Sequence, residues 1–410
     1  MERNRKILRE LAARYYEIAN SDTNRRHILH HKQVNDLKQP RPIVLIDEIP
    51  WQEMNIDNEL TLQCDTEEAR QIETFFRQAI YKWEHLRADM VLRPYYAVGK
   101  VIHASGIGFS RRQNQDGEHQ NVKSHVFKDQ IQTEEDIEKL HFETITYDEA
   151  ATNQQFEFAA DLFGGILPVK ITGAASGGYG LACRTWDEIV DLRGLDTLFY
   201  DLIERPEFIH KLVGKLSDIY MDRIRQFEEL ELFDTDSYYI HCTAALTNDL
   251  TPDHAHPKAK DCWGRSMAQI FASVSPEMHE EFDTDYMVKT MAPFGLVYYG
   301  CCEPLHKKIH IIERIPNLRK ISITPWADVD AAAEIMQDKY VVSAKPNPAA
   351  LADTSLSRSD VRRELDNIIS ACRRNNCSCE LVLKDITTVS GDPRNLFAWE
   401  QVAMEAVQNW

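Results

Sequence analysis

The stretch LVYYGCCEPLHKKI (residues 296–309) begins as a run of apolar and aromatic side chains and changes character at Gly300. The run has the length and composition of a buried strand, and a helical pattern follows it. Between the two lie Cys301, Cys302 and Glu303. In folds that alternate strands and helices, functional side chains usually lie on such connections. The stretch therefore predicts an α/β fold with two thiols and a carboxylate at a functional edge.

Similar short apolar runs occur at seven further places, namely IVLID (43–47), DMVLR (89–93), ILPVKI (166–171), YYIHC (238–242), RKISIT (319–324), YVVSAK (340–345) and ELVLKD (380–385). Segments with helical spacing separate them. One is 205–230, with Phe208, Leu212 and Leu216 on one side, and another is 357–374, which opens on a Ser or Asp cap. Eight β-then-α units predict a (β/α)8 TIM-type barrel. The alternative is an open sheet, in which two of the runs are helix or loop.

The pattern also predicts how the chain is organised. Residues 1–40 precede the first strand and are expected to form a helical N-terminal extension, and residues 41–410 form the barrel. The long interval 94–165 contains the polar segment SRRQNQDGEHQNVKSH and is expected to be an insertion or flap near the barrel mouth.

Composition excludes several classes of partner. The chain of 410 residues carries a formal net charge of −18, which argues against nucleic acid because neutralising phosphates requires the opposite surplus. The charged start lacks the apolar core of a signal peptide, and no later run approaches about 18 apolar residues. We therefore expect a cytoplasmic protein without a membrane partner. Its nine cysteines should be reduced thiols, because their odd number and uneven spacing do not form a disulfide framework.

A barrel selects candidate site residues, because such enzymes work at the carboxyl ends of their strands. These ends carry Asp47, Glu48, Arg93, Tyr95, the loop TGAASGGYG (172–180) with Tyr179, His241, Cys242, Cys301, Cys302, Glu303, Thr324, Trp326, Lys345, Asn347, Lys384 and Asp385. Neighbouring strand residues point to opposite sides, so at most one of Asp47 and Glu48 faces the lumen. Lys384 beside Asp385 has the alternative reading of an ion pair at the rim.

Four motifs stand out in the second half of the chain. They are the Trp263–Gly264 pair, the Ser-Pro-Glu segment at 275–277, the turn GCCE at 300–303 and the closing segment NLFAWEQVAMEAV at 395–407. Together they resemble the uroporphyrinogen decarboxylase superfamily. The resemblance covers roughly residues 160–410 and implies the same barrel fold. The arginine-rich signature of the decarboxylases, similar to MRQAGR, is absent around the first strand. The resemblance therefore favours the corrinoid-linked methyltransferases of the superfamily.

These methyltransferases bind zinc through a His-x-Cys turn and a later Cys. In this chain their His falls at Gly300, their first Cys at Cys302 and their second Cys near Asp385. The resemblance thus implies a zinc site with Cys302, Glu303, His241 and Asp385 as ligands, and a small methylated substrate that exchanges its methyl group with a corrinoid on a separate protein. Barrels of this kind often pair through exposed helices, which predicts a homodimer. The alternative for Cys301, Cys302 and Glu303 is packing, with the glutamate in a first helical turn.

We assign roles on this basis. Catalytic residues are expected to be Glu48, His241 and Asp385, and substrate-binding residues Asp47, Arg93, Tyr95, Tyr179, Trp326 and Lys345. The leading hypothesis is a zinc-dependent methyltransferase. A second is a metal-free decarboxylase or lyase in which Arg93 and Lys345 hold a carboxylated substrate, and a third is a binding subunit without catalysis.

Strand geometry makes one further prediction. Cys379 precedes the strand 380–385 and Asp385 follows it, so a rise of about 3.3 Å per residue separates the two ends by roughly 20 Å. We therefore expect Asp385, and not Cys379, to share a pocket with Cys302.

Overall fold

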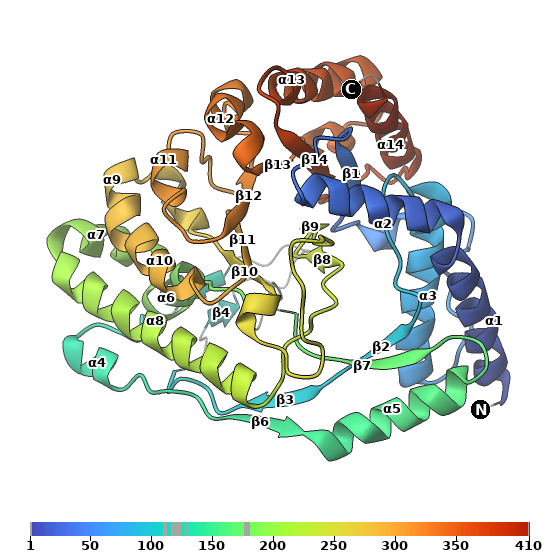
Figure 1. The fold of residues 1–410 in the computed structure, drawn as a ribbon, viewed down its shortest axis with the longest axis horizontal. Coiled ribbons are helices and arrows are strands. Elements are labelled where there is room, and N and C mark those ends of the chain that lie inside the picture. The colour runs from blue at the N-terminus through green and yellow to red at the C-terminus, as the bar shows by residue number, and fades with distance from the viewer. Residues whose placement is uncertain (1, 110–112, 116–124, 128, 176–180, 409) are drawn as a thin grey trace.

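The computed structural model describes residues 2–109, 113–115, 125–127, 129–175, 181–408 and 410. Its central element is a six-stranded sheet whose neighbouring strands all run parallel (Figure 1). In spatial order the strands are β1 (Ile43–Ile46), β14 (Ser378–Leu383), β13 (Val341–Ala344), β12 (Leu318–Ile323), β11 (Leu296–Tyr299) and β10 (Trp263–Ser266). The predicted α/β class with a parallel sheet is confirmed. The closed eight-stranded barrel stays a prediction.

The other described strands form four separate pairs. They are β2 (Tyr96–Gly99) with β7 (Val169–Thr172), β3 (Val101–Ala104) with β6 (Ile145–Asp148), β4 (Gln113–Gln115) with β5 (His125–Phe127), and β8 (Tyr239–Ile240) with β9 (Thr243–Ala244). The pair β2 and β7 is parallel, and the other three are antiparallel. The pairs β2–β7 and β3–β6 lie in the lower part of the view, whereas β1, β13 and β14 of the main sheet lie in the upper part (Figure 1).

Helices lie around the periphery of the molecule (Figure 1). They are α1 (Glu2–Ala19), α2 (Asp22–Asn35), α3 (Glu67–His85), α4 (Glu134–Glu138), α5 (Glu149–Phe163), α6 (Thr185–Arg193), α7 (Leu195–Glu204), α8 (Pro206–Glu229), α9 (Pro276–His279), α10 (Asp285–Met291), α11 (Ile309–Ile312), α12 (Val329–Met336), α13 (Arg358–Arg374) and α14 (Arg394–Val407). Of these, α12, α13 and α14 lie outside the main sheet, and α4 and α5 lie beside the smaller strand pairs (Figure 1). Short 3₁₀ or π segments are Trp51–Glu53, Ala259–Asp261, Gln269–Ser273, Glu280–Thr284, Gln337–Lys339 and Pro348–Ala352. No helix in these described ranges is long and apolar enough to cross a membrane.

Two helices confirm the sequence patterns that predicted them. α8 starts with Pro206 in its first turn, where a missing N–H costs nothing, and buries Phe208, Leu212 and Leu216 on one side. α13 is capped by Ser357, whose hydroxyl accepts the N–H of Asp360. In contrast, the helix expected directly after Glu303 is short and begins only at Ile309.

The prediction of a strand at 89–93 was wrong, because Asp89 lies in a turn and residues 90–93 are irregular. The N–H of Asp89 donates to Val44 O at 3.0 Å, and the Asp89 carboxylate accepts the N–H of Val44 at 2.9 Å and is bound by the Arg41 guanidinium. The N–H of Val91 donates to the hydroxyl of Tyr239. Side chains thus replace the ladder that a strand would use. The apolar run reflects burial alone.

Two other predicted strands exist but lie outside the main sheet. The run 238–242 contains only the two residues of β8, because the chain reverses at His241, whose φ of 55° is left-handed. The run 166–171 corresponds to β7, which pairs with β2. β7 is followed by α6 along the chain, as the pattern predicted, whereas β8 is followed by β9 and not by a helix.

β10 occupies an edge of the main sheet but was not among the predicted strands. Its sequence WGRS lacks the apolar alternation of a half-buried strand, although all four residues are buried. Gly264 is required there, since a Cβ atom would lie 2.6 Å from the ring of Phe294. Close packing, rather than strand propensity, places this segment in the sheet.

The sheet has an apolar face and a polar face. Ile321, Val342 and Leu381 belong to the main apolar core, together with buried residues of the outer helices such as Leu365 and Trp399. Because side chains alternate along a strand, the residues directly before and after each of these three point to the opposite face of the sheet. They include the polar residues Lys320, Ser322, Ser343 and Glu380, and all four are fully buried. The inner face of the sheet therefore carries charge away from solvent.

Candidate active site

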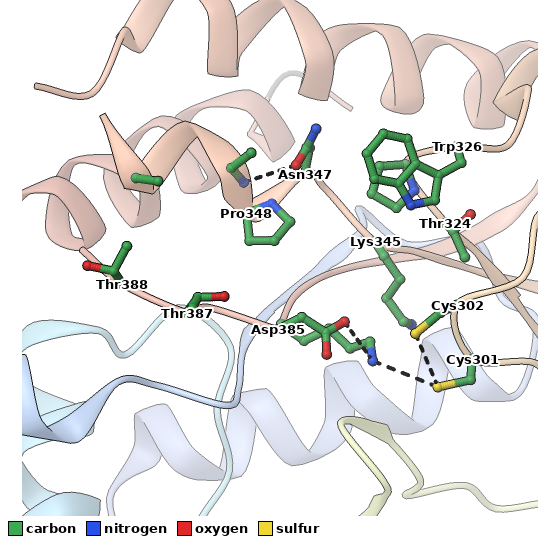
Figure 2. Close-up of a pocket in the computed structure, with 14 residues that line it drawn as sticks. Cys301, Cys302, Thr324, Trp326, Lys345, Asn347, Pro348, Asp385, Thr387 and Thr388 are labelled. Carbon is green, nitrogen blue, oxygen red and sulfur yellow. Dashed lines mark hydrogen bonds and ion pairs between the residues drawn. The ribbon is translucent and has the colours of Figure 1, made fainter. Parts of the chain in front are cut away.

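A cavity of about 410 Å³ lies where four neighbouring strands end (Figure 2). Its walls come from the turns after β11, β12, β13 and β14. The lining residues are Cys301, Cys302, Thr324, Pro325, Trp326, Lys345, Asn347, Pro348, Ala349, Ala352, Lys384, Asp385, Thr387 and Thr388. Parallel strands bring their carboxyl ends to one edge of the sheet. This explains why Cys301 and Thr388, which are 87 positions apart in the sequence, line one cavity. Apart from Glu303, the positions predicted from the ends of these four strands are thus brought together.

A chain of polar contacts crosses the floor of this cavity (Figure 2). The sulfurs of Cys301 and Cys302 lie 3.5 Å apart, and Lys384 Nζ lies 4.0 Å from Cys301 Sγ. On its other side, Lys384 Nζ lies 3.0 Å from Asp385 Oδ2, which confirms the expected ion pair. Lys384 is 4% exposed, so its ammonium connects a thiol and a carboxylate with little access to water.

The two thiols differ in protonation. The hydrogen bond from Cys302 lowers the pKa of Cys301 most, and this effect, together with His241 and Lys384, outweighs the opposing effect of burial. The same interaction raises the pKa of Cys302, so the pair loses one proton and retains the other. Cys301 is therefore the thiolate of the pair, and a thiolate is the reactive form of cysteine.

His241 lies near this pair but lines a second cavity of about 360 Å³, together with Asp47. Burial opposes its charge, but Cys242 and Cys301 more than offset burial and raise the pKa of His241 to about 9. The imidazole therefore contributes positive charge beside Cys301 at neutral pH. The predicted positions Asp47 and His241 meet in one cavity, which is adjacent to the first rather than part of it.

Glu48 connects the first strand to Asp385. The backbone N–H of Asp385 donates to Glu48 Oε2 at 2.8 Å. Burial raises the pKa of Glu48, and the neighbouring Asp385 carboxylate raises it further. Both residues have left-handed backbones, with φ of 51° at Glu48 and 56° at Asp385, so two tight turns meet here. The catalytic roles expected of the two carboxylates stay predictions.

Glu303 is fully buried and does not line the cavity. One carboxylate oxygen accepts the N–H of Ala268 and the other accepts the N–H of Cys301, each at 3.0 Å. Burial raises the pKa of Glu303. The carboxylate therefore holds the turn of Cys301 in place from behind, which is closer to the packing alternative than to a metal ligand.

Arg93 and Tyr95 belong to a different cluster. The Tyr95 hydroxyl donates to Asp236 Oδ2 at 3.2 Å, and Arg93 Nη2 lies 3.7 Å from Asp234 Oδ2. The guanidinium also lies 5.2 Å from the ring centre of Tyr238. Neither residue lines the cavity of Cys301, so the expectation that Arg93 and Lys345 hold one small substrate together does not match this arrangement.

Trp326 and Tyr179 were also predicted to bind substrate. Trp326 lines the cavity and is 70% exposed, an unusual exposure for a large aromatic side chain. Tyr179 lies outside the described residues.

The expected zinc ligands are only partly gathered. Two sulfurs on one tetrahedral zinc, each about 2.3 Å from the ion, lie roughly 3.7 Å apart, so Cys301 and Cys302 suit the ion. Both oxygens of Glu303 are engaged by backbone, however, and Asp385 is paired with Lys384. Across the described ranges, the group of three metal-type side chains close enough to share an ion is Glu59, Glu84 and His85, at the surface. The expected four-residue set does not fit, and zinc stays an expectation from the resemblance.

The geometric prediction about Asp385 is confirmed. Asp385 and Cys302 line the same cavity, whereas Cys379 is fully buried at the start of β14 and does not line it. Cys379 lies at the amino end of β14 and Asp385 follows its carboxyl end, so the length of the strand separates the two residues.

Sequence reasoning assigned no role to the buried charges beneath the cavity. Lys320 Nζ lies 2.9 Å from Glu380 Oε2, and both side chains are fully buried. The hydroxyl of Ser343 donates to Glu380 Oε1, and Lys345 donates to the same hydroxyl oxygen. The detectable signal was the alternation in RKISIT, YVVSAK and ELVLKD, where lysine, serine and glutamate occupy positions of the face opposite the apolar core.

Comparison with known proteins adds little. No family model matches the chain, and no curated protein matches it. Among solved structures, a methyltransferase from Methanosarcina mazei superposes with a TM-score of 0.47 and 9% sequence identity, covering 91% of this chain and 96% of that chain. A likeness at this level is too loose to assign a fold or a function to this chain.

Proposed function

We propose that this chain is a methyltransferase whose reaction takes place in the cavity at the ends of β11–β14. The observation that carries the proposal is the position of Cys301 Sγ, 3.5 Å from Cys302 Sγ and 4.0 Å from Nζ of the buried Lys384; Cys302, His241 and Lys384 together lower the pKa of Cys301. Thiolates are strong nucleophiles toward carbon, and neighbouring cations keep them ionised at neutral pH. The cavity of about 410 Å³ suits a small methylated substrate.

In the proposed step, Cys301 Sγ attacks the methyl carbon of the substrate. A sulfur–carbon bond forms while the bond from carbon to the leaving heteroatom breaks, and the heteroatom departs with the electron pair. The Cys302 thiol, which retains its proton, protonates the leaving heteroatom. Lys384 and His241 stabilise the thiolate before attack. The acceptor in the second half-reaction would be a corrinoid on a separate protein, as the resemblance implies, and no step requires the expected zinc. A homodimer and a cytoplasmic location complete this proposal.

A metal-free decarboxylase or lyase is the second candidate. It is supported by two buried lysine side chains in the same cavity, Lys345 and Lys384, each 4% exposed. Such groups suit a carboxylated substrate. This candidate expects Lys345→Met and Lys384→Met to abolish activity while Cys301→Ser retains most of it.

The test is methylation of cob(I)alamin, followed by its absorbance, with a panel of small methylated alcohols, amines, thiols and methoxy compounds. We expect Cys301→Ser to lower the rate at least about a hundredfold and the matched neighbour Cys302→Ser to lower it less, because only Cys301 is the nucleophile. With a ¹³C-methyl donor and no cobalamin, tandem mass spectrometry should place the label on Cys301.

Two results would contradict the proposal. One is a rate that Cys301→Ser leaves unchanged. The other is no methylation of cobalamin by any compound of the panel together with no label on Cys301.

A further inference from the structure

Lys345 is a buried amine without a carboxylate partner. It is 4% exposed, and its Nζ donates to Ser343 O at 3.2 Å and to Ser343 Oγ. The other two lysines of this interior each have an ion-pair partner, Lys320 with Glu380 and Lys384 with Asp385. No carboxylate oxygen of the described residues lies within ion-pair distance of Lys345. A buried ammonium without such a partner is costly, which favours the neutral amine.

The hydrogen bonds around Lys345 suit that neutral form. Burial opposes ionisation of Glu380, but the Lys320 ammonium at 2.9 Å and the hydrogen bond from Ser343 lower its pKa, so the Ser343 hydroxyl donates to a carboxylate. Ser343 Oγ is then an acceptor for Lys345, as is Ser343 O. A neutral amine has two N–H groups and one lone pair, so the two oxygens of Ser343 occupy both hydrogens and leave the lone pair available.

Burial is the main reason why the pKa of Lys345 is lowered. The Lys384 ammonium lowers it further, and Cys242, Glu380 and Cys301 oppose this effect without cancelling it. Lys384 itself keeps its charge, because Cys301 and the hydrogen bond with Asp385 are among the effects that outweigh burial and raise its pKa. The cavity thus holds a neutral amine next to an ammonium, an arrangement that activates lysine as a nucleophile.

Two polar atoms beside Lys345 lack partners among the described residues. Thr324 Oγ1 is 4% exposed and lines the cavity, and its strand lies next to that of Lys345, whose N–H donates to Ile323 O at 2.8 Å. The hydroxyl of Tyr298 is fully buried, and Lys345 Nζ lies 5.7 Å from the centre of its ring. Buried polar groups are normally hydrogen-bonded, so the Thr324 hydroxyl, which lines the cavity, indicates a polar ligand at this place.

We propose that Lys345 is a nucleophile that condenses with the carbonyl carbon of a small 2-oxo acid, whose carboxylate is held by Lys384. Figure 2 shows Lys345 among the side chains that surround the cavity, and Lys384 lines the same cavity. The Thr324 hydroxyl lies on the adjacent strand end, where it can hydrogen-bond the oxygen of the adduct. This inference goes beyond methyl transfer and does not depend on it, because it uses the amine and not the thiolate.

The step balances without an oxidant or a reductant. The lone pair of Nζ forms a carbon–nitrogen bond as the carbonyl π electrons move to oxygen, which takes a proton and gives a carbinolamine. The carbon–oxygen bond then breaks, and oxygen leaves as water with one further proton. Counting the proton that nitrogen releases, the amine, the carbonyl compound and one proton from solvent give a protonated imine and water.

The experiment is reductive trapping with pyruvate, the simplest 2-oxo acid, and sodium cyanoborohydride, followed by tandem mass spectrometry of the whole unmodified chain. The neutral fraction of an amine changes about tenfold per pKa unit, so we expect Lys345 to collect at least about tenfold more adduct than the exposed Lys339. Lys345→Arg should lose this adduct. Lys384→Met should require a pyruvate concentration roughly tenfold higher, through loss of the carboxylate contact.

The site mapping on the unmodified chain needs no variant to fold, so a misfolded variant does not affect it. Adduct spread evenly over exposed lysines, or none on Lys345, would overturn the inference. Lactate, which has no carbonyl group, separates the remaining alternative. Equal thermal stabilisation by lactate and pyruvate without trapping would show that Lys345 is an ammonium that binds anions, and would also overturn it.

Discussion

Replacing Glu380 by glutamine should destabilise the chain strongly, because it leaves the Lys320 ammonium buried without a countercharge. Lys320 Nζ lies 2.9 Å from Glu380 Oε2 and donates to Ala244 O at 2.6 Å, and both charged side chains are fully buried. Breaking such a pair typically costs about 3–5 kcal/mol. The loss has a ceiling, since Lys320 can release its proton instead of remaining charged.

That ceiling follows from the pKa of lysine. With an unfolded pKa of about 10.4, keeping Lys320 neutral at pH 7 costs about 4.6 kcal/mol at roughly 1.36 kcal/mol per pKa unit. The unfolded state of Glu380→Gln then binds one more proton than the folded state, so the stability of the variant rises with pH. The difference from the wild-type chain should therefore shrink by up to about 1.4 kcal/mol for each pH unit between 7 and 9.

The assay is urea unfolding followed by tryptophan fluorescence at pH 7, 8 and 9. The matched control is Asp218→Asn, which breaks an ion pair of 2.7 Å with Lys289 in which both side chains are more than half exposed. Exposed pairs contribute about 0–1 kcal/mol, so the control should change stability by less than about 1 kcal/mol. A Glu380→Gln variant within about 1 kcal/mol of the wild type at pH 7, or a deficit that does not depend on pH, would refute the reasoning.

Three further predictions concern other titratable positions. Burial lowers the pKa of His31 from 6.5 to about 4, so the free energy of unfolding present above pH 6.5 should fall by about 3 kcal/mol as the pH approaches 4. In urea unfolding, His31→Gln should remove most of this pH dependence, and a variant with the pH dependence of the wild type would contradict the prediction. Lys384→Met should raise the pKa of Cys301, which lies at about 4, by about one unit, measured by peptide mass spectrometry as a shift of the midpoint in the pH dependence of alkylation by iodoacetamide; an unshifted midpoint would show that the ammonium does not act on the thiol. Glu303→Gln replaces one of two accepting oxygens by an amide that faces a backbone N–H, so unfolding free energy should drop by about 2 kcal/mol, whereas wild-type stability would exclude the supporting role.

Much of the fold could be predicted from local sequence. The runs at 43–47, 296–300, 319–324, 340–345 and 380–385 are strands of the main sheet, because continuous burial on both faces selects short apolar segments. Helices α8 and α13 were predicted from their apolar spacing and from the cap at Ser357. Each of these patterns spans only a few neighbouring residues, so it can be recognised in a single sequence without knowledge of tertiary contacts.

Hydrogen-bond pairing was not predictable in the same way. The segment 89–93 is as apolar as a strand, but Asp89 binds the neighbouring backbone through its carboxylate. β10 lacks a strand pattern, and its place depends on the packing of Gly264 against Phe294. In both cases the partner is distant in sequence, and its identity decides whether an extended segment becomes a strand.

For the candidate site, the sequence by itself determined which residues stand at the strand ends, and thus that Cys302, Lys345 and Asp385 share one cavity while Cys379 does not. Only the tertiary structure decided the hydrogen-bond partners and the protonation of each group. It turns Glu303 to the backbone behind Cys301, and it leaves Lys345 without a carboxylate. The physical reason is that protonation depends on burial and on charges within a few ångströms, and those neighbours come from strands far apart in the chain.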